Sequence, residues 1–481
     1  MTTSSAALSA GPTTSFGVPP QDRSSRRALA RRLHTPAWWR LACGIAAWAS
    51  VVLVVALWVH GGGVQELAGM GTGLTSIGRL AGLVGSDLLL LQVLLMARVP
   101  WVERAFGQDD LARRHSLATY SVGFMMAYVV AISLGHSAAA STGLWSTIAD
   151  VVASYPGMLP GVAGTVALVA VAVTPNEAVR RRLRYESWPL RHVYAGLGLL
   201  LVLPHQLGTG QGFLTSTLAT VLWWALWVAA AASVLIWRVG QPWWRSRRHR
   251  LVVAEVRPEN DRVTTVVIRG QMLDQLPVRA GQFFQWRFLE GPGFSQAHPH
   301  SLSAAPDGRT LRITVAHPGG GSAQLAGLRP GTRVFFEGPY GRLHEGVRTR
   351  RKVLLMASGI GITPMRALLE DLDQGPGEVT LVYRVGSERE RILMDELNTL
   401  ADLHQTRFFV VTGHRVSSRR SWLPEHVAYV DDSEALRLIV PDVAEHDVFV
   451  SGSPGWVEAV KRAAIGAGVP RGQVHIERFA S

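Results

Sequence analysis

Cysteine is nearly absent from this sequence of 481 residues, and charged residues are scarce. The single cysteine, Cys43, excludes an internal disulfide and any cysteine-rich zinc or iron–sulfur centre. Charged residues make up 17% of the chain and hydrophobic residues 48%, a balance that disfavours an ordinary soluble protein. At roughly 150 residues per domain, the length allows two or three folded units.

Lysine is also rare, so the net charge of +13 comes almost entirely from arginine. A basic balance is typical of proteins that bind nucleic acid and of loops that face anionic lipid. Here the arginines cluster at the ends of apolar runs, which favours the lipid bilayer as the partner and no nucleic acid. Residues 1–40 are rich in Ser, Thr, Ala, Pro and Arg and predict a disordered, basic cytosolic tail. Because the first apolar run begins only after residue 40, we expect no cleavable signal peptide.

Before residue 240 the sequence contains six apolar runs, each about long enough to cross a hydrocarbon core of ~30 Å. They are Leu41–Val59, Ile77–Ala97, Ser116–Leu134, Met158–Val173, Pro189–Pro204 and Thr217–Trp237. The fourth and fifth are short enough to resemble buried soluble helices if taken singly. Six in succession predict a six-helix transmembrane bundle over residues 41–238.

The arginines alternate between the loops that join these runs. They precede the first run, separate the second from the third and the fourth from the fifth, and follow the sixth, whereas residues 60–76, 135–156 and 206–214 contain neither Lys nor Arg. Cytosolic loops carry the excess of positive charge in membrane proteins. We therefore expect a multi-pass protein of the plasma (cytoplasmic) membrane with both termini in the cytosol.

Histidines occur near the ends of the third and fifth runs, where polar groups are costly and usually functional. His192 and His205 are 13 residues apart, which corresponds to about 20 Å along a helix. This spacing suits two haems, one near each leaflet, because imidazole is a common axial ligand of haem iron. The alternative is that each histidine caps a helix or bonds to a neighbour.

The sequence supports a haem in the inner leaflet more strongly than a haem in the outer leaflet. His115 and His192 both lie beside arginine-rich loops, so we expect an inner haem between them. In the outer half, His205 faces Val129 on the third run, while His136 lies nearer the rim. An outer haem could use His136, use a single ligand, or be absent. Arg79 is a candidate cation for a haem propionate, with a snorkelling side chain as the alternative.

After Trp244 the hydropathy falls and a segment rich in β-branched residues begins, with candidate strands at Leu251–Val256 and Val263–Ile268. Gly-rich turns follow, and such turns expose backbone N–H groups that can hold a pyrophosphate. From Lys352 strands alternate with helices, and Val353–Met356 leads into the turn Gly359–Pro364. This alternation predicts a doubly wound parallel sheet that binds its ligand at the carboxyl ends of the strands.

Taken in order, these features resemble the ferric reductase/NADPH oxidase superfamily over about residues 42–481. The resemblance rests on His-Pro-His-Ser at 298–301, Gly-Gly-Gly-Ser at 319–322, Gly-Pro-Tyr-Gly at 338–341, Gly-Ile-Gly-Ile-Thr-Pro at 359–364 and Glu-Arg-Phe at 477–479. It implies a haem-binding membrane domain at 41–238, an antiparallel β-barrel that binds FAD at 249–347 and an α/β domain that binds NAD(P)H at 350–481.

The resemblance also implies roles for individual residues. The catalytic group would be Ser301, Ser451, Glu477 and Phe479, with Ser451 in place of the cysteine often found beside the nicotinamide. Flavin would be held by His298, Pro299, His300, Ser301, Gly319, Gly320, Gly321 and Ser322, with His300 where the family usually has Phe or Tyr. The nicotinamide nucleotide would be held by Gly359, Gly361, Thr363, Pro364 and Gly452, with Arg384 and Arg389 on a 2′-phosphate, which favours NADPH over NADH. His115, His192 and His205 fall on family haem-ligand positions, and the fourth falls at Val129.

The resulting hypothesis is an NAD(P)H:acceptor oxidoreductase of the ferric reductase or NADPH oxidase type. Electrons would pass from NADPH through FAD to one or two b-type haems, and then to oxygen or a ferric chelate outside. If the outer haem is missing, a quinone or a membrane partner becomes the favoured acceptor. A membrane-anchored flavoprotein without transmembrane transfer is one alternative. A non-enzymatic haem or iron sensor with a decayed reductase module is another.

Overall fold

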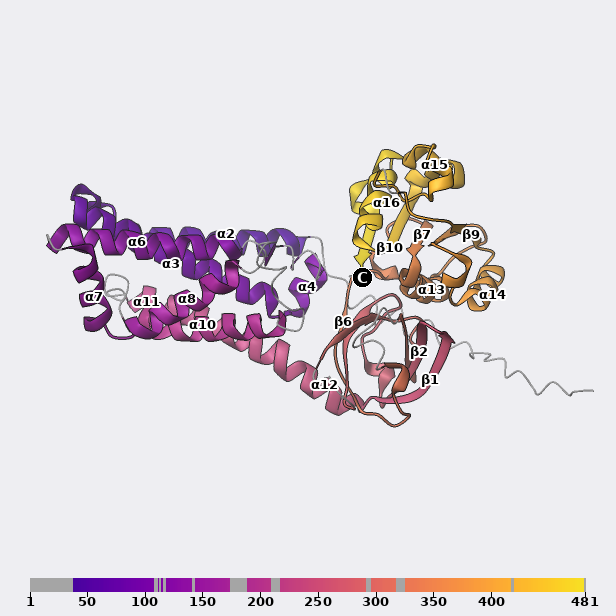
Figure 1. The fold of residues 1–481 in the computed structure, drawn as a ribbon, viewed down its shortest axis with the longest axis horizontal. Coiled ribbons are helices and arrows are strands. Elements are labelled where there is room, and N and C mark those ends of the chain that lie inside the picture. Colours follow the sequence, from indigo (N-terminus) through magenta and orange to yellow (C-terminus); the bar gives the residue numbers. More distant parts are fainter. Residues whose placement is uncertain are drawn as a thin grey trace, which may run out of the picture.

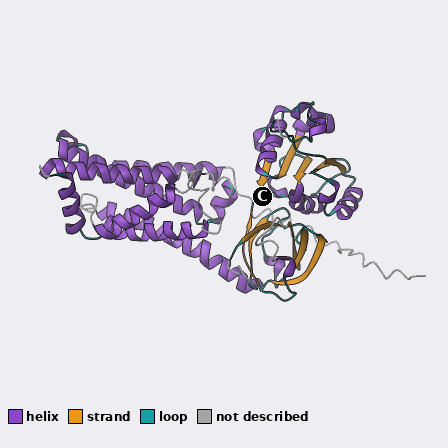
Figure 2. Cartoon of the chain, viewed as in Figure 1, coloured by secondary structure: helices purple, strands orange, loops and turns teal. Residues whose placement is uncertain are grey.

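The computed structural model describes residues 38–107, 111, 114–115, 118–140, 143–173, 188–208, 217–290, 296–316, 325–416 and 419–479. Its parts form an elongated helical half and a β-rich half with two lobes (Figure 1, Figure 2). The proposed pyrophosphate turn Gly319–Ser322 and most of the Arg-rich loop near residue 180 lie outside the described residues.

Long apolar helices make up the first half, and each of the six apolar runs lies on one of them. They are α2 (Trp38–His60), α3 (Met70–Met96), α6 (Ala118–Ala140), α8 (Met158–Val173), α10 (Trp188–Gly208) and α11 (Thr217–Ser233). By length and hydropathy, four described helical segments can cross a membrane, or five if the bent pair α7 (Leu144–Ser154) and α8 counts as one. Many of their large apolar side chains are exposed, as a lipid-facing surface requires.

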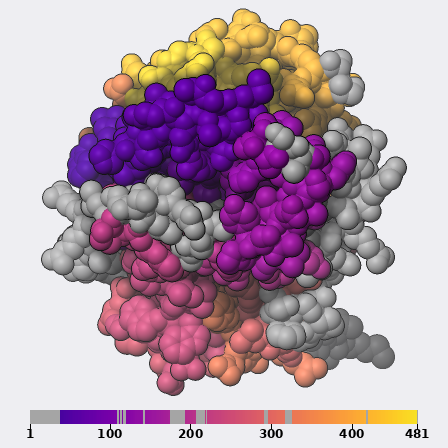
Figure 3. Space-filling view, turned by 90° about the vertical axis from the view of Figure 1, so that its left-hand side faces the viewer, coloured from indigo at the N-terminus to yellow at the C-terminus, as the bar shows by residue number. Residues whose placement is uncertain are grey.

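Glycines let two of these helices approach closely. A Cβ on Gly78 of α3 would lie 3.1 Å from the backbone nitrogen of Ile132, and one on Gly85 would lie 3.2 Å from the carbonyl oxygen of Ser121. Small residues at such spacings replace the hydrophobic driving force that lipid does not provide between helices. Seen from the end far from the β-rich half, the early indigo helices and the magenta α6–α7 segment lie side by side (Figure 3).

The last membrane helix continues into the reductase half. α11 is followed by a π-helical turn, η3 (Val234–Gly240), and then by α12 (Gln241–His249), which reaches the β-rich lobe (Figure 1). The helix ends at Arg250, whose φ of 42° turns the chain into the first strand. The predicted boundary near Trp244 therefore falls inside a helix, because Arg247 and Arg248 are polar but helix-compatible.

The described residues of the first lobe form six strands in two antiparallel three-stranded sheets. One sheet has the order β1 (Val252–Asn260), β2 (Val263–Arg269), β5 (Thr310–Ala316), and the other β4 (His298–Ser301), β3 (Phe283–Phe288), β6 (Val334–Tyr340). Single bridges join the sheets at Val252–Arg333 and Leu302–Ile313. The enclosed core contains Phe284, Trp286 and Phe336, all fully buried.

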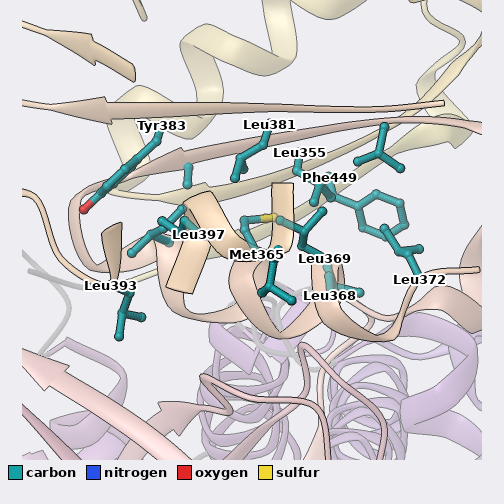
Figure 4. Close-up of a cluster of buried hydrophobic side chains, with 14 of the residues drawn as sticks. Leu355, Met365, Leu368, Leu369, Leu372, Leu381, Tyr383, Leu393, Leu397 and Phe449 are labelled. Carbon is teal, nitrogen blue, oxygen red and sulfur yellow. The ribbon is translucent and has the colours of Figure 1, made fainter. Parts of the chain in front are cut away.

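The second lobe is the expected doubly wound parallel sheet. Its five strands have the order β11 (Val474–Arg478), β10 (His446–Gly452), β7 (Lys352–Ser358), β8 (Val379–Val385), β9 (Arg407–Thr412), all parallel. Helices α13 (Ile362–Asp371) and α14 (Met394–His404) cover one face, where Leu355 and Phe449 belong to a fully buried cluster (Figure 4). Helices α15 (Asp432–Ile439) and α16 (Pro454–Gly466) cover the other face.

Candidate functional site

The carboxyl ends of β7 and β10 lie at the centre of the parallel sheet, and the first candidate site is built there. Ser451 of β10 pairs in register with Ala357 of β7 on one side and with Glu477 of β11 on the other. Ligands of open α/β sheets bind outside the carboxyl ends of such strands. The predicted residues from the end of the chain and from the middle of the lobe thus meet at the expected edge.

A hydrogen bond joins the two lobes at this edge. Ser301 Oγ, at the end of β4, donates to Glu477 Oε1 over 2.8 Å, and both residues are buried. The backbone N–H of Phe479 donates to the carbonyl oxygen of Gly452 over 3.0 Å, which holds the last described residue beside the same edge. The structure therefore brings together all four residues predicted to be catalytic, although they are far apart in the sequence.

The hydroxyl of Ser451 is a polar atom of this site without a partner. Ser451 is fully buried, and its Oγ has no hydrogen-bond partner among the described residues. Burying a hydroxyl without a partner costs about 1–3 kcal/mol on the scale of protein mutational data. Such an orphaned group beside Glu477 is consistent with a ligand that supplies the missing acceptor or donor.

The turn Gly359–Gly361 begins the first helix of the lobe. Gly359 has a φ of 55°, and a Cβ built there would meet no atom within 4 Å, so this side of the turn is open. A Cβ on Gly361 would lie 2.4 Å from the carbonyl oxygen of Ser451, so only glycine fits there. Thr363 Oγ1 donates to the carbonyl oxygen of Ile360 over 3.0 Å and locks the turn, followed by the buried Pro364. Such a glycine turn at a helix N-terminus suits a pyrophosphate.

Two parallel imidazole rings lie on the strand that carries Ser301. The rings of His298 and His300 are 6.1 Å apart with an angle of 1° between their planes. Burial lowers the pKa of His298, which keeps this ring neutral at pH 7. Trp286 Nε1 donates to the carbonyl oxygen of His300 over 3.0 Å and fixes this backbone, while Pro299 between the rings is exposed.

The cations predicted to bind a 2′-phosphate lie elsewhere. Arg384 is buried, and its guanidinium donates to the carbonyl oxygens of Val385 and His414. These backbone acceptors compete with a phosphate for the guanidinium. Arg389 is exposed on the turn after β8. A residue that the sequence analysis missed, Arg415, is exposed just after β9, and its Nη2 would lie 2.8 Å from a Cβ on Gly455 at the start of α16. The sheet order places it beside the same carboxyl edge.

In the helical half, His115 contacts a buried amide on a neighbouring helix. Its Nδ1 lies 3.2 Å from Oε1 of the buried Gln92 on α3. Metal-bound histidines usually donate their other ring N–H to such an acceptor, which fixes the tautomer and the ring orientation. His192 lies on α10, but its side chain is outside the described side chains. Among the described residues no cluster of three or more His, Cys, Asp or Glu side chains is arranged to hold a metal ion.

The histidines of the outer half are engaged with protein. His205 Nε2 lies 2.7 Å from the hydroxyl of Tyr128, a residue that the sequence analysis did not select. His136 Nδ1 lies 2.9 Å from the carbonyl oxygen of Ile132 on its own helix. Arg79 forms an ion pair with Glu66. The predicted outer residues are therefore not brought together around one centre.

Long apolar helices joined to an antiparallel lobe and a doubly wound lobe place the chain in the class of membrane oxidoreductases, in agreement with the comparison with known proteins. Residues 81–203 match the model for the ferric reductase like transmembrane component, and residues 355–462 match the oxidoreductase NAD-binding domain. The chain is 31% identical over 198 residues to ferredoxin–NADP reductase B of Sorangium cellulosum (strain So ce56). The matched region is 39% of this chain and 80% of that protein. The chain thus contains a ferric reductase-like transmembrane domain, and its second half belongs to the ferredoxin–NADP reductase family.

Two further proteins are similar over about half of this chain. The ferredoxin reductase component of 3-ketosteroid-9-alpha-monooxygenase from Rhodococcus rhodochrous is 29% identical over 49% of this chain and 66% of its own length. The FAD/NAD-binding domain of nitric oxide dioxygenase from Vibrio cholerae O1 biovar El Tor is a solved structure with 24% identity, covering 49% of this chain and all of that domain with a TM-score of 0.39. The chain spans just under two thirds of the length of the Rhodococcus protein.

Proposed function

We propose that this protein is a membrane NAD(P)H oxidoreductase that uses NADPH and FAD to reduce a haem in its own helical half. The observation that carries the proposal is the hydrogen bond between Ser301 and Glu477 beside the orphaned hydroxyl of Ser451. It unites residues of both lobes at one edge, where a flavin and a nicotinamide would meet. The domains are those of the sequence analysis: a tail at 1–40, a membrane domain at 41–238, a flavin domain at 249–347 and a nucleotide domain at 350–481.

The flavin would lie between the two lobes of the reductase half. The bridges Val252–Arg333 and Leu302–Ile313 support a closed antiparallel barrel as its platform. His298, Pro299, His300 and Ser301 would face the ring, with the Gly319–Ser322 turn on the pyrophosphate. Bound there, FAD would accept a hydride and pass electrons singly to haem, which a nicotinamide does not readily do.

The nucleotide would lie along the carboxyl edge of the parallel sheet. Gly359, Gly361, Thr363 and Pro364 would hold its pyrophosphate, and Gly452 would leave room for the nicotinamide beside Ser451. Arg415, rather than the buried Arg384, would bind the 2′-phosphate, because its exposed guanidinium lies at the start of α16. A planar guanidinium suits phosphate recognition, which favours NADPH over NADH.

In the membrane half, six spans with both termini in the cytosol are supported by the six apolar runs and the alternating arginines. His115 and His192 would bind an inner haem, with Gln92 orienting His115. The electron acceptor would be oxygen, a ferric chelate or a quinone. The second candidate function, a membrane-anchored flavoprotein without haem, keeps the same reductase site.

The test is anaerobic reduction of the detergent-purified protein by NADPH, with flavin and haem followed by their absorbance. We expect the flavin to bleach and the haem bands of the reduced state to follow. In His115→Ala the flavin should bleach as in the wild type, but no haem bands should appear. Flavin bleaching in a wild-type protein that contains no haem would favour the anchored flavoprotein, and no flavin bleaching would overturn the proposed activity.

A further inference from the structure

We propose that the outer half of the membrane domain holds no haem and that a Tyr128–His205 hydrogen bond takes its place. This inference rests on the proposed function, since it assumes the inner haem at His115 and His192. It makes the protein a one-haem reductase.

The ring nitrogen of His205 that would bind iron is already hydrogen-bonded to a phenol. His205 Nε2 lies 2.7 Å from the hydroxyl oxygen of Tyr128, a short, well-formed hydrogen bond. Each ring nitrogen of histidine has one in-plane bonding direction, and this one is directed at the phenol in either tautomer. An iron atom bound to Nε2 would have to occupy the position that the hydroxyl of Tyr128 takes.

Glycines pack closely against both residues of this pair. His205 is only 8% exposed, and Gly157 and Gly161 of the α7–α8 segment press against it. A Cβ on Gly161 would lie 3.1 Å from the Cβ of His205. On the other side, a Cβ on Gly82 of α3 would lie 2.9 Å from the ring of Tyr128. Side chains larger than glycine at these positions would push the two residues apart, so the small residues support the Tyr128–His205 contact.

An outer haem would also need a second axial ligand and a cation for its propionates. The bis-histidine partner is missing, because Val129 occupies that position and its side chain is 39% exposed. His136 Nδ1 lies 2.9 Å from the carbonyl oxygen of Ile132, the kind of contact that His115 makes with Gln92, so this bond does not bar His136 from iron; its ring lies edge-on to Tyr155 at 6.3 Å. Arg79, the candidate partner of a propionate, is paired with Glu66 at the same end of the bundle. The Nε2 of His205 and the guanidinium of Arg79 thus have protein partners, and the position opposite His205 has no histidine.

The inner site differs in the kind of partner it has. His115 is bonded through Nδ1 to an amide oxygen, an arrangement that supports ligation by the other ring nitrogen. His205 is bonded through Nε2 to a hydroxyl, which competes with ligation. The hydrogen bond of His115 therefore favours ligation of iron, whereas the hydrogen bond of His205 opposes it.

The experiment counts haem per chain in the detergent-purified full-length protein by pyridine haemochrome. We expect one haem in the wild type, one in His205→Ala and one in Tyr128→Phe, and none in His115→Ala. A potentiometric titration of the wild type should show a single one-electron wave. The flavin content and the elution profile of each variant report whether it has folded, and Tyr128→Phe keeps the ring that packs on Gly82.

Two haems per chain in the wild type, or loss of haem on substituting His205 in a protein that keeps its flavin, would overturn this inference. Either result would leave the proposed reductase intact. By contrast, a wild type with no haem would overturn the haem part of the proposed function and this inference together. The two failures are therefore distinguishable.

Discussion

Ser451 carries its hydroxyl into the centre of the sheet edge, between Ala357 and Glu477 on the neighbouring strands. Its neighbour Gly361 approaches so closely that a Cβ there would meet the Ser451 carbonyl oxygen at 2.4 Å. Residue identity at this edge is thus set by contact distances as well as by chemistry. A serine hydroxyl and a glutamate that already bonds to Ser301 form a small polar centre inside an apolar lobe.

Arg415 gives a residue-scale prediction about nucleotide choice. Replacing it with Ala should raise the KM for NADPH by about tenfold or more, because a charge-assisted hydrogen bond is worth about 1.5–3 kcal/mol. The KM for NADH should change by less than about twofold, since NADH has no 2′-phosphate. Steady-state kinetics with ferricyanide as acceptor measures both.

Arg389→Ala is the matched control, because Arg389 is an exposed arginine on the neighbouring turn. It should leave both KM values unchanged. If Arg389→Ala raised the KM for NADPH and Arg415→Ala did not, the assignment from the sequence would be right and the one argued from the structure wrong.

At two positions the sequence alone did not predict the contacts of the side chain. The depth arithmetic pointed to Val129 opposite His205, but each residue turns the helix by about 100° and raises it by only 1.5 Å. Tyr128 therefore lies at nearly the same depth on a different face, and it is the residue that meets His205. Arg384 was expected after the strand but lies within β8, whose residues are all buried because helices cover both faces of the sheet, and its guanidinium therefore bonds to backbone carbonyl oxygens.

At the scale of elements, much more of the fold was predictable. Apolar helices, the strands near 251–256, 263–268 and 353–356, and the parallel sheet appear where hydropathy and periodicity place them, although only four or five of the described helices meet the length and hydropathy of a membrane span. These signals are local and repeated, so they survive without tertiary information. The meeting of Ser301 with Glu477, across 176 positions of sequence, came from the resemblance to a family and from no local pattern.

A contact between elements of the two halves gives the next prediction. Arg98, in the turn after α3, has a φ of 61°, and its Nη1 lies 2.7 Å from Glu337 Oε2 on β6. The guanidinium also lies 4.4 Å from the centre of the Tyr340 ring. Both charged side chains are nearly buried, at 12% and 8% exposure, so this ion pair is screened less than a surface pair. It joins β6 of the first lobe to the end of α3.

Replacing Arg98 with Gln should slow electron transfer from flavin to haem by about tenfold, because one charge-assisted contact that positions the lobe is lost. The reduction of flavin by NADPH should stay within about twofold, since it occurs inside the reductase half. Stopped-flow absorbance resolves the two steps under anaerobic conditions.

The control for this pair is Arg287→Gln. Arg287 Nη1 lies 2.5 Å from the other oxygen of Glu337, but it belongs to the same lobe as that residue. Its loss should leave both electron-transfer steps within about threefold of the wild type. Equal slowing of both steps in Arg98→Gln would mean that Arg98 supports folding of the lobe and does not position it.

At the scale of the whole molecule, the number of haems decides how far an electron travels. In the proposed one-haem reductase, the reductase half lies at the cytosolic end, His115 and His192 would hold the haem, and the Tyr128–His205 pair occupies the outer half of the bundle. An acceptor then has to approach the haem from within the membrane. A lipid-soluble quinone can do so, whereas a hydrated ferric complex outside cannot enter hydrocarbon without a large desolvation cost.

Inverted membrane vesicles, with the reductase half facing the medium, test this prediction. With external NADPH and no oxygen, we expect a short-chain benzoquinone to be reduced in a reaction that His115→Ala slows by about tenfold or more. Ferricyanide enclosed in the vesicle lumen should not be reduced above the rate in protein-free vesicles. Because the bilayer excludes this anion from the flavin outside, its reduction could only come from electrons that have crossed the whole bundle. Rapid reduction of enclosed ferricyanide that depends on both His115 and His205 would contradict the one-haem path, since it requires a second electron carrier beside His205.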